Sequence, residues 1–146
     1  MKRSILSLVV IAVAMMSSVS AFAAEHPAYL HALADLRAAR WLINHHPGND
    51  WKQSEDEAGA VRAIDGAINE IKHAAIDDHK DLNDHVGVQE INERGGRLRK
   101  AADLLKRTRE DVNQHEENGF AQGLKERALR QIDEALRLTQ RAMMAK

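Results

Sequence analysis

The sequence predicts an all-α protein, an antiparallel up-down-up-down four-helix bundle. Three observations lead to this prediction. Aromatic residues make up only 3% of the 146 residues, whereas alanine, leucine, arginine and glutamate, which favour helices, are abundant. Apolar residues recur at spacings of three and four, the period of an α-helix. Breaks that contain glycine or proline divide the chain into four such stretches.

The first 23 residues have the features of a cleaved secretory signal peptide. Lys2 and Arg3 precede an apolar run of about a dozen residues, which is shorter than the roughly 20 needed to span a bilayer. The run ends at the small-residue site Ala21-Phe22-Ala23. Cleavage after this site would leave residues 24–146 as a single domain. We therefore expect a periplasmic or secreted protein with no membrane span after cleavage.

Composition excludes several kinds of site. The chain has no cysteine, so it forms no disulfide, thiolate metal site or covalent c-type haem link. Loss of Lys2 and Arg3 would leave 19 basic and 22 acidic residues, which gives no general attraction to nucleic acid. We expect no enzyme, because GxSxG, HExxH, phosphate-loop and paired ExxH motifs are missing. No b-type haem is expected, since pairing Met143 with a histidine has no support in the sequence.

Four helices are predicted near residues 27–45, 55–78, 96–115 and 121–144. The second has apolar residues spaced by three or four, namely Val61, Ile64, Ile68, Ile71 and Ala75. This spacing predicts one buried stripe with alanines beside it for close helix approach. The connection between the second and third helices is about 17 residues long. Helix connections of this length are uncommon, so we expect it to be functional or mobile.

Two pairs of segments match at one and the same displacement along the chain. AVRAIDGAI at 60–68 aligns with ALRQIDEAL at 128–136, and LHALADL at 30–36 aligns with LRKAADL at 98–104. A constant displacement across two helix pairs indicates a duplicated helical hairpin, with repeats at about 27–78 and 96–144. Each hairpin is too thin to bury its own apolar stripe, so the two should dock into one bundle.

The stretch IKHAAIDDHKDLNDH at 71–85 is a candidate metal site. His73 and Asp77 are four residues apart and would share a helix face, and His79 and His85 follow them. Imidazole together with carboxylate suits copper, nickel or zinc. The alternative is a solvated helix end, because the heptad pattern places His73 opposite the apolar stripe.

A second candidate site arises at the new N-terminus. Cleavage after Ala23 would start the mature chain with Ala24, Glu25 and His26. The free amine, the two deprotonated amides and the imidazole of His26 can then form the square-planar set of four nitrogens that Cu(II) and Ni(II) prefer. The alternative is a plain helix start, with Pro27 at the first helical position.

The up-down-up-down order predicts that both candidate sites meet. It places the start of the first helix, the end of the second, the start of the third and the end of the fourth at one pole. The histidines expected near that pole are His26, His31, His73, His79 and His85. Those expected near the opposite pole are His45, His46 and His115.

With a signal peptide, no cysteine, and His73, His79 and His85 beside acidic residues, the mature chain resembles the small periplasmic metal-binding proteins. These are alanine-rich helical bundles that bind copper and other divalent ions. The dense histidine repeat of that family is missing here, because no histidine follows His115. The resemblance implies binding of a divalent metal, copper or nickel before zinc, in a sequestration or stress role. The alternative is an envelope interaction or chaperone-like stress protein without metal. The protein partner and the oligomeric state stay open.

Overall fold

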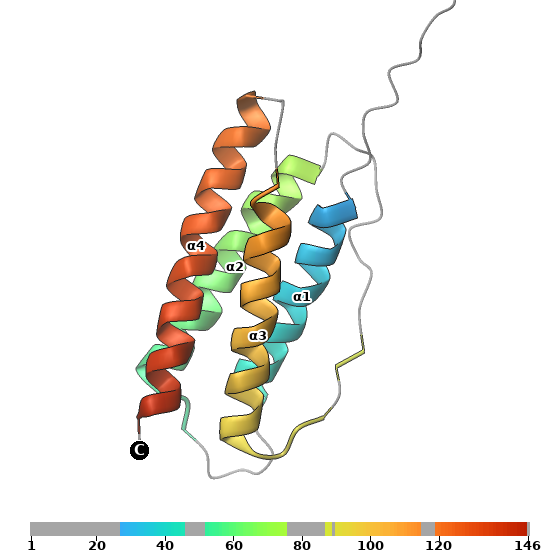
Figure 1. The fold of residues 1–146 in the computed structure, drawn as a ribbon. Helices are drawn as coiled ribbons and strands as arrows, with labels where there is room; N and C mark the ends of the chain where they lie inside the picture. The colour runs from blue at the N-terminus through green and yellow to red at the C-terminus, as the bar shows by residue number, and fades with distance from the viewer. Residues whose placement is uncertain (1–26, 46–51, 76–86, 89, 115–118, 146) are drawn as a thin grey trace, which may run out of the picture.

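The computed structural model describes residues 27–45, 52–75, 87–88, 90–114 and 119–145. These residues form four α-helices and no strand, which confirms the predicted all-α four-helix bundle (Figure 1). The helices are α1 (Pro27–Asn44), α2 (Glu55–Ala75), α3 (Arg94–Val112) and α4 (Gly119–Met144). Both α3 and α4 begin two residues earlier than expected, and α3 ends three residues earlier. The predicted last turn of α2, at 76–78, lies outside the described residues.

The start of α2 shows how local sequence fixes a helix end. Ser54 and Glu57 form a capping box, in which the Glu57 backbone N–H donates to Ser54 Oγ at 3.2 Å. The Ser54 backbone N–H donates in return to Glu57 Oε2 at 2.9 Å. Three acidic residues in this first turn also suit the positive end of the helix dipole.

Each helix buries one apolar stripe in a common core. The predicted stripe of α2 is largely correct, because Ile64, Ile68 and Ile71 are buried and Val61 packs half-buried against the core. Small residues dominate the facing stripe of α4, namely Ala121, Ala128, Ala135 and Ala142. Alanine at these positions lets the backbones of α2 and α4 approach closely. None of the described helices combines the length and apolarity needed to cross a membrane.

The chain direction differs from the predicted up-down-up-down order. The closest helix pairs are α2 with α4 and α1 with α3, while α1 with α4 and α2 with α3 lie on the diagonals. Arg141 contacts Asp56 at 3.3 Å, which brings the end of α4 to the start of α2. Arg94 contacts Glu57 at 3.1 Å, which brings the start of α3 to the same place. Figure 1 shows α1 and α4 running downward and α2 and α3 running upward, so the predicted order is wrong although all packed neighbours are antiparallel.

The length of the connection between α2 and α3 makes this order possible. It comprises residues 76–93 and joins helix ends at opposite poles. A connection of this length can reach about 59 Å when extended, whereas the 21 residues of α2 span only about 30 Å. Near its end, Val88 and Ile91 pack half-buried against the core.

We call the two ends of the bundle the upper pole and the lower pole, as they appear in Figure 1. The upper pole holds the start of α1, the ends of α2 and α3, and the start of α4. The lower pole holds the end of α1, the starts of α2 and α3, and the end of α4. The third and fourth helices therefore present opposite ends from those predicted.

The burial pattern is compatible with a duplicated hairpin, which stays a prediction. At the displacement that aligns the letters, α2 and α4 have buried residues in both copies, at Ala60 and Ala128, Ile64 and Ile132, and Ala67 and Ala135. The buried positions of α1 and α3 match better when α3 is shifted by one more residue, at Ala32 and Ala101, Leu36 and Leu105, and Ile43 and Val112. For α1 and α3, the alignment by identical residues and the alignment by buried positions thus differ by one residue.

Candidate functional site

A polar groove lies between the start of α1 and the end of α3, toward the upper pole. Its volume is ≈ 340 Å³, and its lining residues are His31, Ala34, Asp35, Arg107, Glu110 and Asp111. Apart from Ala34, every one of these side chains is polar or ionisable. The groove is therefore suited to a hydrated or charged ligand rather than to an apolar one.

Helix spacing and the antiparallel packing of α1 on α3 together build the groove. His31 and Asp35 are four residues apart and share one face of α1, and Arg107 and Asp111 do the same on α3. Arg107 Nη2 lies 3.3 Å from both carboxylate oxygens of Asp35. This ion pair joins the two walls of the groove.

The surroundings of Asp35 in the groove shift the pKa of its carboxyl. Burial raises the pKa of its carboxyl above the ordinary value, and the negative charge of Asp111 raises it further. The charges of Arg107, His31 and Lys100 act in the opposite direction and lower this pKa, but desolvation is the largest effect. The groove therefore holds a carboxylate whose ionised form is disfavoured by its surroundings.

Only one of the seven predicted metal-site residues is described. His73 is exposed in the last turn of α2, which agrees with the solvated alternative. The other six, Ala24, Glu25, His26, Asp77, His79 and His85, lie outside the described residues. Within the ranges that the structure describes, no group of three or more histidine, aspartate and glutamate side chains could hold a metal ion as placed.

The histidines of the described helix ends divide between the poles. His31 near the start of α1 and His73 near the end of α2 both belong to the upper pole, as the sequence predicts. His45 belongs to the lower pole, where its ring stacks on Trp41 with centroids 4.2 Å apart. His115 lies outside the described residues, but α3, the helix that precedes it, ends at the upper pole and not at the predicted one.

No signal in the sequence selects Asp35, Arg107 or Asp111. Each pair at a spacing of four is visible in the chain, but such pairs are common on solvated helix faces. Only the antiparallel contact between α1 and α3 brings the two pairs together. Comparison of the chain with protein families, with curated proteins and with solved structures gave no match, so functional inference rests on these residues.

Proposed function

We propose that the protein is an exported helical bundle that binds a divalent transition metal, copper or nickel in preference to zinc, in a sequestration or stress role. One observation carries the proposal, namely the gathering of imidazole and carboxylate groups at the upper pole. The sequence Ala24-Glu25-His26 directly precedes Pro27, the first residue of α1. The polar groove that contains His31 and Asp35 begins one turn further along the same helix.

The N-terminal chelate and the polar groove would contribute differently to metal binding. An N-terminal amine, two amides and the imidazole of His26 complete a square-planar set of four nitrogens without any help from the bundle. The groove has three carboxylates, on Asp35, Glu110 and Asp111, against the one guanidinium of Arg107. Its excess of negative charge would raise the local concentration of a cation near the chelate.

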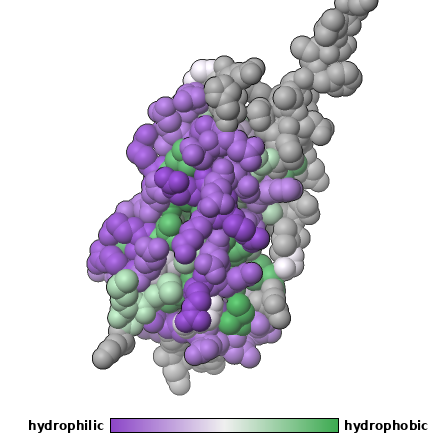
Figure 2. Space-filling model, in the orientation of Figure 1, coloured by the Kyte–Doolittle hydropathy of each residue, from purple (hydrophilic) through white to green (hydrophobic). Residues whose placement is uncertain are grey.

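The alternative of a chaperone-like protein has less support. Binding of unfolded clients requires a contiguous apolar surface. Among the described residues, the large exposed hydrophobic side chains are Phe120, Met143 and Met144. Phe120 lies in the first turn of α4 and the two methionines lie at its end, so about 35 Å of helix separates them. Figure 2 shows that hydrophilic residues cover most of the face drawn there.

Native mass spectrometry of the mature exported chain with one equivalent of Cu(II) tests this proposal. We expect a mass that begins at Ala24 and retains one copper ion. His26→Ala should lose the retained copper with unchanged helical circular dichroism, because the four-nitrogen set loses its imidazole. His45→Ala at the lower pole is the matched control and should retain copper.

Two outcomes would contradict the proposed chelate. Retention of copper by the His26→Ala chain at the level of the parent would show that His26 is not a ligand. A mature chain that begins at Glu25 would place the histidine second and remove the required geometry. If His45→Ala also lost its copper, the loss in His26→Ala could not be assigned to the missing imidazole of His26, and the proposed chelate would lose its support.

A further inference from the structure

In the ion pairs that join the two helical hairpins, the negative charge always comes from the same hairpin and the positive charge from the other. We call α1 with α2 the first hairpin and α3 with α4 the second hairpin. Four ion pairs between described residues join them, and in each the first hairpin supplies the carboxylate and the second hairpin supplies an arginine. They are Asp35–Arg107 at 3.3 Å, Asp56–Arg141 at 3.3 Å, Glu57–Arg94 at 3.1 Å and Glu70–Arg127 at 3.0 Å.

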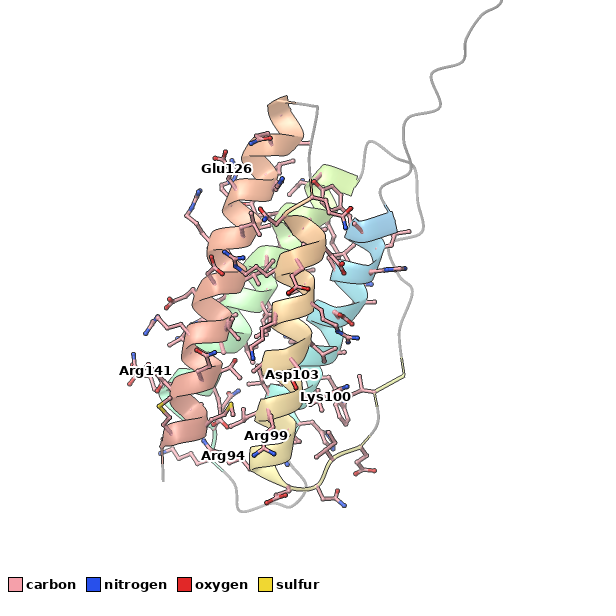
Figure 3. All side chains as sticks on the ribbon, viewed as in Figure 1. Arg94, Arg99, Lys100, Asp103, Glu126 and Arg141 are labelled. Carbon is pink, nitrogen blue, oxygen red and sulfur yellow. The ribbon has the colours of Figure 1, made fainter. Side chains whose placement is uncertain are left out.

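These pairs are distributed over the whole interface. Asp56 and Glu57 lie in the first turn of α2 and meet their arginines at the lower pole, where Figure 3 shows Arg94 at the start of α3 and Arg141 near the end of α4. Asp35 and Glu70 meet theirs nearer the upper pole. Both inter-hairpin contacts, α1 with α3 and α2 with α4, contain such a pair.

The charges of the helices follow the same polarity. The helices of the first hairpin contain four lysine or arginine residues and six aspartate or glutamate residues. Those of the second contain twelve and six respectively. In an interface between two hairpins of the same kind, all four of these ion pairs would lose their partners. Each hairpin is therefore complementary to the other kind and not to itself.

We propose that the first hairpin of one copy also binds the second hairpin of another copy, so that two chains exchange hairpins in a closed dimer. The interface between hairpins would be the one already present within a single chain, and no new surface is required. The connection formed by residues 76–93 already joins opposite poles. Its extended reach of about 59 Å allows it to pass from one bundle to a neighbouring one. This proposal does not depend on metal binding.

Charge reversal in the full mature chain tests the exchange. One chain carries Asp56→Arg with Glu70→Arg, and the other carries Arg127→Glu with Arg141→Glu. Within either chain alone, like charges face each other at the two sites of the Asp56–Arg141 and Glu70–Arg127 pairs between α2 and α4. When the two chains exchange hairpins, one bundle has both pairs reversed and the other has both original pairs. Only the exchanged heterodimer restores every ion pair.

The chains are unfolded in urea, mixed with one of them isotope-labelled, refolded and measured by native mass spectrometry. We expect the heterodimer to exceed the two homodimers by at least about tenfold. The parent chain, labelled and unlabelled, should give dimers with random mixing of labels. A chain that carries all four changes should fold as the parent does and controls for damage by the substitutions.

Two results would overturn the proposal. In the first, the mixture contains only the two monomers, while the four-change chain folds normally. In the second, homodimers of the charge-reversed chains form as readily as the heterodimer, which would mean association through another surface. Copper binding at the N-terminus is measured separately, so neither result bears on the proposed metal site.

Discussion

Asp35 shows how one residue connects the groove to the pH dependence of stability. Burial raises the pKa of its carboxyl in the folded chain. A raised pKa means that the folded state favours the protonated form. The contribution of Asp35 to stability is therefore greatest below its ordinary pKa of 3.8, and it declines as the pH rises through the raised folded value.

We expect this contribution to appear in a comparison with Asp35→Asn. The substitution keeps the size of the side chain and removes its titration. Relative to the variant, the parent should gain stability as the pH is lowered from neutral toward the ordinary pKa of an aspartate. Urea denaturation of both chains at several pH values measures the difference. A difference that is independent of pH, or that moves in the opposite direction, would show that Asp35 ionises freely in the fold.

The groove also shows what the sequence can and cannot provide at the residue scale. The sequence places His31 at the correct pole, because its position along α1 is enough to place it. It does not select Asp35 and Arg107, because their ion pair depends on which helix faces α1. Spacing identifies residues that share one face of a helix. It does not identify the face of another helix that lies opposite.

At the scale of helices, two glycines of α2 lie close to side chains of α4. A Cβ atom built on Gly59 would lie 3.0 Å from Leu138 Cδ1, and one built on Gly66 would lie 3.1 Å from the side chain of Gln131. Both glycines face α4 and are seven residues apart in the sequence, two turns along the same face. Larger side chains at these positions would push the helices apart.

We expect Gly59→Leu to lower the free energy of unfolding by about 1–3 kcal/mol, because overpacking outweighs the better helix propensity of leucine. Gly123→Leu is the matched control in α4. A Cβ there would meet only the Arg127 guanidinium at 3.6 Å, so this variant should gain up to about 1 kcal/mol. Urea denaturation followed by circular dichroism measures both. Equal gains in the two variants would mean that the side chain of Leu138 can move aside at no cost.

Local signals predict the helices better than their register. The start of α2 and both ends of α1, α3 and α4 fall within about three residues of the expected positions, because breakers and caps act within a few residues. The alignment of α1 with α3 by matching letters is one residue away from the alignment by burial. Alanine-rich helices align almost equally well at neighbouring registers. Residue identity therefore does not determine which face of a helix packs against the core.

At the scale of the molecule, the order of the helices is the feature that the sequence did not predict correctly. An up-down-up-down order follows if every connection is short. The long connection between α2 and α3, residues 76–93, allows either order, so the choice depends on contacts between the ends of helices. Glu57, with its side chain only 1% exposed, binds Arg94, whose Nη2 also donates to the Ala142 carbonyl at 3.2 Å. These contacts join the starts of α2 and α3 to the end of α4.

We therefore expect Glu57→Ala to destabilise the bundle by about 3 kcal/mol, the lower end of the range for a buried ion pair, because the side chain of Arg94 keeps 32% exposure. Glu70→Ala, which breaks the more exposed pair with Arg127, is the matched control and should cost less than about 1 kcal/mol. Urea denaturation gives both values. Glu57→Gln should be intermediate, since glutamine can still complete the capping box with Ser54. If Glu57→Ala costs no more than Glu70→Ala, apolar packing and not this ion pair selects the order of the helices.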